Sequence, residues 1–428
     1  MAETPARWTI VAGLVLIQAL LLLLLGTALL PSTINWHLMD LDTYANASGR
    51  LLDGMLPYRD FRLEYPPFAI VAFLLPHLLA FGLPLEGRAY DGLFGLSIVV
   101  YSTLTAVCLS LLPRRWPTPR GTAGTLGVYA LFVAIMAPLL PWRYDLFPAL
   151  LTLLGFIALL DRRPLASGLL LGLGVAAKLY PLVIIALFGT LLLARRDLRG
   201  LLWLALGSAG GLLLGLMPFL LITPEGLLSF LSYHELRGLQ IESGAGSLIC
   251  LLGVLGLITV EPSFSFGAFH LASPLSDPAL ALLTPLFLLA LGALLLFCFR
   301  QERRAANRPL SAERLAGLVA AVLLVFMITN KVFSPQYIIW LLPFIPLLPR
   351  RQVLFCGLVC GLTIVLFPFL YGQLLALLPG PVLMLSLRNL LVLLLIPWLL
   401  AGDRSALVDT QGVADQSGPL TPAIPEEG

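Results

Sequence analysis

Charge is the scarcest property of this sequence. Of its 428 residues, 11% are Asp, Glu, Lys or Arg and 59% are hydrophobic, which gives a mean hydropathy of +0.96. A soluble domain carries about 25% charged residues because its surface must face water. The low charge therefore excludes an ordinary soluble domain and indicates a protein whose surface is largely in contact with lipid.

Lysine is nearly absent, and the chain also lacks the basic runs that bind nucleic acid and the cysteine pattern of a disulfide framework. The chain has 26 Lys and Arg residues, of which only Lys178 and Lys331 are lysines. No basic run resembles a nucleic-acid-binding surface, so we expect no nucleic-acid partner. The five cysteines lie mostly inside apolar segments, where we expect small packing residues and no disulfide framework. We also expect no cofactor and no bound metal.

Long apolar runs take the place of the missing charge. They recur along the whole chain, and each is long enough to cross the hydrocarbon core of a bilayer as a helix. Only helices and closed barrels satisfy the backbone in lipid, and Leu-rich runs of this length exclude a barrel. The sequence therefore predicts an all-α polytopic membrane protein with about 12 transmembrane helices over residues 1–402, one of them over 336–349. A disordered cytoplasmic tail is expected over 403–428, which is rich in Pro, Gly, Ser and acidic residues.

Arginine clusters orient the predicted helices. The positive-inside rule places these clusters in the cytoplasm; they lie at 114–120, 162–163, 195–199, 300–314 and 350–351. Two large segments, 31–88 and 222–280, then lie on the outer face, together with short turns near residues 143 and 178. The first apolar run, 8–30, is too long for a signal peptide and is expected to be the first span.

The segment 66–83 conflicts with a simple count of spans. If it crossed the membrane together with the apolar runs 8–30 and 89–112, the arginine cluster at 114–120 would fall outside. Because the segment opens with two prolines, we expect it to lie along the outer interface. The alternative is that it crosses and the arginine loop lies outside, since the positive-inside rule is a bias.

Polar residues that are unusual for a membrane protein gather on the predicted outer side. Charged groups in or beside a membrane are costly, so their positions indicate function. Five outer segments each supply carboxylate, cation or amide groups, which we interpret as one cleft for an anionic, hydroxyl-rich substrate. The candidate substrate-binding residues are Asp42, Tyr44, Glu64, Tyr65, Arg143, Asp145, Lys178, Tyr180, His234, Arg237, Lys331, Gln336 and Tyr337.

Several of these positions also have a purely structural interpretation. A helix cap or a solvated loop would explain Asp40, which shares a helix face with Tyr44. An ion pair at a hairpin tip would explain Arg143 with Asp145. Lys178 lies at the apex of a short apolar hairpin, where it either snorkels to the interface or binds an anion, and we favour the anion.

The order of several short motifs resembles one known family. The chain contains, in order, Asp40-Leu41-x-x-Tyr44, Leu51-Leu52-x-Gly54, Pro57-Tyr58, Tyr65-Pro66-Pro67, Arg143-x-Asp145, Gly168 through Lys178-x-x-Pro181, and Ser334-Pro335-Gln336-Tyr337-x-x-Trp340. This series, over most of residues 8–400, resembles the bacterial polyprenyl-phosphate-mannose-dependent mannosyltransferases of glycosyltransferase family 87. The resemblance implies the GT-C membrane fold, in which the first outer loop holds the catalytic carboxylate and membrane-parallel helices precede the second span.

The resemblance also implies a function. Asp40 matches the aspartate that acts as general base, and the donor is a sugar linked to polyprenyl phosphate. An outer active site needs such a donor because nucleotide sugars stay in the cytoplasm. We therefore expect a multi-pass protein of the bacterial plasma membrane that moves a hexose, mannose by the resemblance, to a lipid or glycan acceptor by inverting displacement. Candidates for the leaving phosphate are Lys178, Arg237, Lys331 and Arg143.

Other interpretations remain open at this stage. Asp42 is the alternative base, and Asp42 or Glu64 could instead bind a metal. A lipid or polysaccharide transporter or flippase would explain the spans and the cleft, although we find no internal repeat, and the charges lie near one face. A non-catalytic assembly factor would explain the bundle but not the five polar segments.

Overall fold

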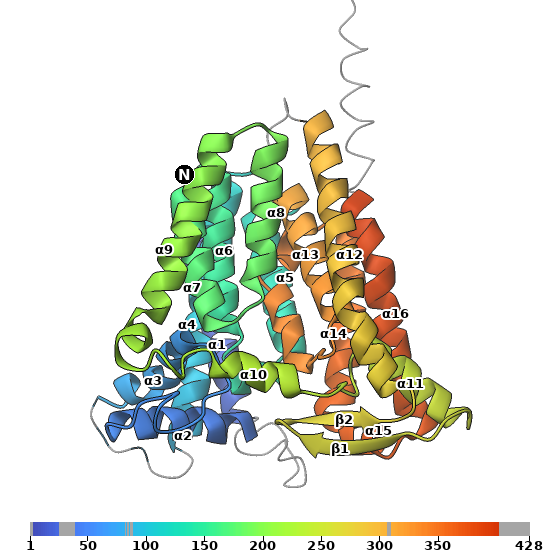
Figure 1. The fold of residues 1–428 in the computed structure, drawn as a ribbon. Coiled ribbons are helices and arrows are strands. Elements are labelled where there is room, and N and C mark those ends of the chain that lie inside the picture. Colours follow the sequence, from blue (N-terminus) through green and yellow to red (C-terminus); the bar gives the residue numbers. More distant parts are fainter. Residues whose placement is uncertain are drawn as a thin grey trace, which may run out of the picture.

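The computed structural model of the chain describes residues 3–24, 39–81, 83, 85, 89–305 and 310–401. It is a bundle of helices with a single two-stranded sheet among the described residues (Figure 1). This confirms the prediction of a helical, multi-span membrane protein. The predicted tail, 403–428, lies outside the described residues.

Six helices of the described chain are long and apolar enough to cross a bilayer. They are α4 (Ala89–Leu111, extended by a 3-10 turn to Arg114), α9 (Leu198–Ile222), α12 (Ser276–Arg304), α13 (Ala312–Thr329), α14 (Arg350–Ile364, continuing to Phe369) and α16 (Pro379–Ala401). Five other predicted spans correspond to helices that are shorter or only partly apolar over the described residues. These are α1 (Glu3–Leu24), α5 (Gly121–Ile135), α6 (Leu146–Leu160), α7 (Pro164–Ala177) and α8 (Pro181–Ala194). The total of about 12 spans therefore stays a prediction.

One predicted span, 336–349, is not an α-helix. The chain runs there through two 3-10 turns, η6 (Pro335–Leu341) and η7 (Ile345–Leu347), because prolines recur at short intervals and remove backbone donors. The segment is buried between helices, and Arg120 donates hydrogen bonds to the carbonyls of Pro346 and Leu348 at 3.2 and 2.6 Å. Irregular backbone at membrane depth is tolerated when protein surrounds it in this way.

The two ends of the bundle differ in composition. We call one the arginine end; it holds residues 114–120, 161–163, 195–199, 300–305, 310–314 and 350–351. Ion pairs join helices there: Arg115 with Asp161, at 2.8 Å, and Arg195 with Glu302. Short elements gather at the opposite end, which we call the cavity end (Figure 1). They are α2 (Met39–Leu52), α3 (Ile70–Leu79), α10 (Ser229–Leu236), α11 (Gly244–Val254), β1 (Glu261–Ser265), β2 (Ala268–Ala272) and α15 (Tyr371–Leu375).

The helical segment around α3 is shorter than a full membrane span and lies at one end of the bundle (Figure 1). A 3-10 turn (Pro67–Ala69) leads into α3, which has ten residues and a proline in its last turns. Ten helical residues extend about 15 Å, half of a hydrocarbon core of about 30 Å. The helix lies beside α2 at the cavity end (Figure 1), which supports the interfacial placement of residues 66–83. The side of the membrane on which it lies stays a prediction.

Glycines bring α7 and α9 into direct backbone contact. A Cβ atom added at Gly168 or Gly172 would lie 2.2 Å from a backbone oxygen of α9. The same change at Gly207 or Gly211 would meet a backbone oxygen of α7 at 2.2 or 2.1 Å. Small residues at four-residue intervals allow this approach in membrane helices. The contact anchors the mostly lipid-facing α9 and holds α7, whose C-terminal end carries Lys178.

Candidate functional site

A cavity of about 560 Å³ lies at the cavity end of the bundle. Its walls come from α2, the loop before α3, the α5–α6 and α7–α8 turns, α10, the loop 237–243, the β1–β2 hairpin, α12, α13, η6 and the segment 367–371. Most of the residues predicted to contact substrate line it: Asp40, Glu64, Tyr65, Arg143, Lys178, Tyr180, His234, Arg237, Lys331, Gln336 and Tyr337. The fold thus brings together all five polar segments of the sequence.

Three predicted binding residues do not line the cavity. Asp42 is exposed, because the helix that turns Asp40 toward the cavity turns a residue two positions later away from it. Tyr44 is fully buried and stacks on Phe73 with ring centroids 4.4 Å apart. Asp145 is also fully buried. Tyr44 and Asp145 therefore support neighbouring groups that do reach the cavity.

Asp40 lies in the first turn of α2, where the partial positive charge of the helix N-terminus favours a carboxylate. Its Oδ2 is 3.2 Å from Nε of Arg143. Arg143 is almost fully buried, and its Nε also donates to Oε1 of Gln336 at 3.0 Å. The hydroxyl of Ser334 donates to the same oxygen. This chain of contacts orients the Asp40 carboxylate, of which 22% of the side-chain surface stays accessible.

Lys178 is held by a second buried pair. Its Nζ lies 2.5 Å from Oδ1 of Asp145, which also accepts a hydrogen bond from Nε1 of Trp340 at 2.7 Å. The ammonium sits over the ring of Tyr144, 4.6 Å from its centroid. The structural alternative for Arg143 and Asp145 was an ion pair with each other at a hairpin tip. In the structure, Arg143 pairs with Asp40, and Asp145 pairs with Lys178. Tertiary folding brings closer partners than sequence neighbours provide.

Aromatic rings form the wall beside Lys178. Trp340 is stacked between Tyr180 and Tyr337, each with its ring centroid 4.1 Å from that of Trp340. The sequence alone could also explain Tyr337 and Trp340 as an interfacial aromatic belt. Both are buried or half-buried in the cavity wall, so they shape the site from the inside.

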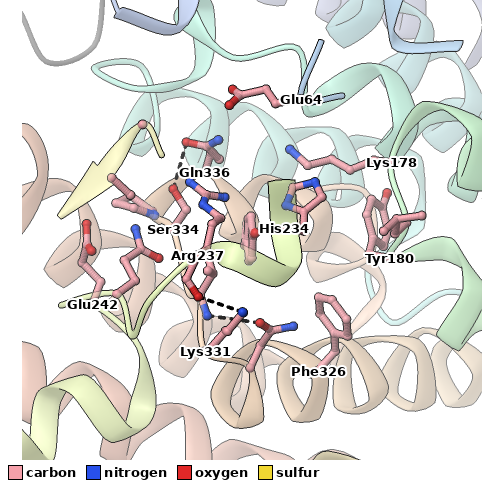
Figure 2. A pocket seen from close by; sticks show the side chains of 18 of the residues that line it. Glu64, Lys178, Tyr180, His234, Arg237, Glu242, Phe326, Lys331, Ser334 and Gln336 are labelled. Carbon is pink, nitrogen blue, oxygen red and sulfur yellow. Dashed lines mark hydrogen bonds between the residues drawn. The ribbon is translucent and has the colours of Figure 1, made fainter. Parts of the chain in front are cut away.

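Glu64 and His234 both line the cavity, and Lys178 ends between them in Figure 2. Burial raises the pKa of the Glu64 carboxyl, although a hydrogen bond from Tyr233 partly opposes this. Burial and the nearby charges of Arg237 and Lys178 lower the pKa of His234 to about 4, so the imidazole is neutral near pH 7. Figure 2 shows both side chains close to the ends of Lys178 and Arg237.

Lys331 and Arg237 use their charges differently. The Nζ of Lys331 donates hydrogen bonds to the carbonyl oxygens of Glu235 and Arg237 at 2.7 and 2.8 Å, which fixes the end of α10 (Figure 2). Arg237 lines the cavity, and its Nε has no hydrogen-bond partner among the described residues. Arg237 is therefore better placed than Lys331 to bind an anion.

An apolar wall completes the cavity. Leu280, Leu283 and Phe287 of α12 and Phe326 of α13 line it. The other face of α12 carries exposed leucines, and the helix is among the least buried of the long ones. One helix therefore borders both the charged cavity and the surface that would contact lipid.

Some polar residues of the site are not among the binding residues predicted from the sequence. Glu242 and Gln240 line the cavity, and Arg388 of α16 donates a hydrogen bond from Nη2 to the Glu242 carbonyl at 2.9 Å. Burial raises the pKa of the Glu242 carboxyl to about 7. A signal was present, since Arg388 is the single charged residue of an otherwise apolar helix and such residues indicate function.

No group of three or more His, Cys, Asp or Glu side chains in the described parts of the chain is arranged to hold a metal ion. Asp42 and Glu64, considered above as metal ligands, are in no such group. The described side chains of the cavity therefore offer acid–base groups and anion-binding groups.

Comparison with known proteins gives two results. The model of glycosyltransferase family 87 matches residues 63–327, which is more than half of the chain. Among solved structures, the fold is similar to ArnT from Cupriavidus metallidurans, crystallised bound to undecaprenyl phosphate, with a TM-score of 0.48 and 17% sequence identity over 99% of this chain and 82% of that chain. A comparison with curated proteins gave no match.

Proposed function

The chain belongs to glycosyltransferase family 87, and we propose that it transfers a hexose from a polyprenyl-phosphate donor to a lipid or glycan acceptor. The motif resemblance suggests mannose as the hexose. The observation that carries the proposal is the composition of the cavity, which combines an accessible carboxylate, buried cations and an apolar wall. A glycosyl phosphate attached to a lipid needs all three. A transporter would not need a carboxylate positioned as a base.

Asp40 is the proposed general base. In the reaction, its carboxylate accepts the proton of the acceptor hydroxyl while the acceptor oxygen forms a bond to the anomeric carbon. The bond from that carbon to the phosphate oxygen breaks, and its electron pair leaves with the polyprenyl phosphate. Because attack and departure take place on opposite faces of the carbon, a single displacement inverts the anomeric configuration. The contact with Arg143 orients the carboxylate.

Lys178 and Arg237 are the proposed phosphate ligands. Negative charge develops on the leaving phosphate, and positioned cations stabilise it most when water is excluded. Lys178 is 14% exposed at its side chain, toward the cavity, and keeps donor capacity beyond its bond to Asp145. The guanidinium of Arg237 lies on the same wall as His234 (Figure 2). Both cations therefore face the space in which the phosphate would lie.

The apolar wall accounts for the lipid part of the donor. The first polyprenyl units would lie against Leu283, Phe287 and Phe326, and the rest of the chain would continue into the bilayer along α12. The positive-inside rule places the arginine end in the cytoplasm and hence the cavity on the outer face. There a nucleotide sugar is absent, which supports a lipid-linked donor.

A transfer assay tests this function. Purified protein in nanodiscs would receive radiolabelled polyprenyl-phosphate mannose, or the glucose analogue as a control, with a mixed extract of membrane lipids and glycans. We expect a mannosylated product of inverted anomeric configuration from the mannose donor. Failure to transfer either hexose to any component, by protein shown to be folded, would contradict the proposal.

A further inference from the structure

The cavity has a second polar wall, formed by Gln240 and Glu242. In Figure 2, Glu242 lies on the opposite side of Arg237 from Lys178, so this wall is separate from the proposed phosphate ligands. Gln240 is 3% exposed and Glu242 is 4% exposed, and both line the cavity. Neither residue has a place in the mechanism above.

Each of the two side chains keeps an oxygen without a partner. Among the described residues, Oε1 of Gln240 and Oε2 of Glu242 are buried and accept no hydrogen bond. A buried acceptor that lacks a donor is costly, and such pairs in a cavity indicate a ligand that supplies donors. The two oxygens therefore call for O–H or N–H groups of a molecule in the cavity.

The backbone that carries these acceptors is held in place from several sides. The amide of Gln240 donates to the Lys331 carbonyl at 2.9 Å. The carbonyl of Glu242 accepts a hydrogen bond from Arg388 at 2.9 Å, and Asn389 donates to the carbonyl of Ser243 at 3.2 Å. Arg388 thus positions the backbone of the loop, and Tyr371 forms a hydrogen bond with the Glu242 carboxyl group, which leaves Oε2 as its oxygen without a partner among the described residues.

The chemistry of this wall selects among ligands. Two acceptor oxygens, one of them on a carboxyl group, would repel a phosphate. A metal ion would need further ligands, which the described residues do not supply. Phe269 and Tyr371 line the same side, with ring centroids 5.9 Å apart, and offer a surface for the C–H groups of a sugar ring. A neutral, polyhydroxylated ring satisfies both parts of the wall.

We propose that Gln240 and Glu242 form a sugar-binding subsite, in which their unpaired oxygens accept hydrogen bonds from the hydroxyl groups of one monosaccharide unit. The inference rests on the proposed function, because it assigns the substrate contacts of the same cavity. The unit is either the hexose of the donor or the terminal sugar of a glycan acceptor. Both present the same hydroxyl donors, and an experiment can distinguish them.

The test compares the full-length wild-type protein with Glu242→Gln, which is nearly isosteric, and with Gln240→Ala. Glu261→Gln is the matched control, since this exposed carboxylate lies on β1 outside the cavity lining. Binding is measured in nanodiscs with polyprenyl-phosphate mannose as donor probe and octyl mannoside as acceptor probe. Each probe is also used in forms that lack one hydroxyl group. Transfer is assayed with the same samples.

We expect both site variants to weaken the binding of one mannosyl probe by about tenfold or more, the usual effect of losing a hydrogen bond to a charged or buried group, and the control to bind normally. The probe that is affected identifies the sugar. Removing the contacted hydroxyl should weaken binding to the wild type and have little further effect on Glu242→Gln.

Folded Glu242→Gln and Gln240→Ala proteins that bind both probes as the wild type does would overturn the subsite, even if transfer occurs. Wild-type protein that binds neither probe would overturn it as well. If the wild type binds a mannosyl probe through Glu242 but transfers no sugar, the subsite is supported and the proposed function fails.

Discussion

Buried charge occurs at both ends of this molecule, but it is used differently at each. At the arginine end, Arg195 pairs with Glu302, and Arg314 donates hydrogen bonds to the carbonyls of Leu399 and Leu400 in the last turn of α16. These contacts satisfy the charges and join neighbouring helices. At the cavity end, several charged groups are left with capacity to spare. The charges at the arginine end therefore stabilise helix packing, whereas those at the cavity end still have hydrogen-bonding groups that a substrate could use.

The two ends also differ in the buried atoms that lack a hydrogen-bond partner. Among the described residues, every buried charged side chain with an atom that lacks a hydrogen-bond partner belongs to the cavity end: Asp145, Arg237, Glu242 and Arg388. Because such atoms reduce stability, a protein keeps them where binding or catalysis compensates for the loss. Satisfaction of hydrogen bonds is therefore a better guide to this site than charge alone.

The largest effect is expected from Asp40→Asn. The change is nearly isosteric and the carboxylate is partly accessible, so the protein should stay folded. Transfer should fall by about 10²- to 10⁴-fold, the usual contribution of a positioned acid or base. Asp42→Asn, two residues away on the exposed face of α2, is the matched control and should lose much less. Equal transfer by Asp40→Asn and wild type at saturating donor would remove Asp40 from catalysis.

A smaller effect, confined to the donor, is expected from Lys178→Ala. Loss of a charge-assisted hydrogen bond to phosphate should weaken donor binding by about 10- to 100-fold and leave acceptor binding unchanged. Direct binding of polyprenyl-phosphate mannose measures this. Because removing the lysine also leaves Asp145 buried without its cation, Lys178→Arg is included to keep the charge. Normal donor affinity in a folded Lys178→Ala protein would return this residue to a structural role.

At the arginine end, Glu302→Gln should affect stability alone. The variant removes the anion that faces Arg195, which should cost about 1–3 kcal/mol and lower the thermal unfolding temperature by a few degrees. The KM values for donor and acceptor should not change. A variant with normal stability but altered KM would show that the two ends are coupled, and so would contradict the separation of roles described above.

The smallest effect is expected from Leu85→Cys, which tests orientation. Residue 85 belongs to the segment 31–88, which we predict to be wholly outside, and it lies away from the cavity lining. A membrane-impermeant thiol reagent should label it in intact cells without loss of transfer, provided that the native cysteines are replaced. Labelling only after permeabilisation would place the segment, and the cavity with it, on the cytoplasmic side.

Much of the fold class and part of the site follow from local pattern. The lengths of the apolar runs predict membrane helices because a bilayer sets the number of residues needed to cross it. The short motifs resemble family 87, and the family match confirms that resemblance. The segment 336–349 shows the limit of this reasoning, since its hydrophobicity suggested a helix while its prolines produced buried 3-10 turns. Burial in protein and burial in lipid demand the same apolar residues.

The sequence by itself determined that this chain is a helical membrane protein and that its unusual polar residues lie in five segments between apolar runs. Only the tertiary structure decided their partners. It paired Asp40 with Arg143 and Lys178 with Asp145, and it brought Arg388 of α16 into hydrogen-bond contact with the carbonyl of Glu242. The physical reason is that hydrophobic length is a local property of the chain. The pairing of buried charges, in contrast, depends on which helix ends meet once the bundle has packed.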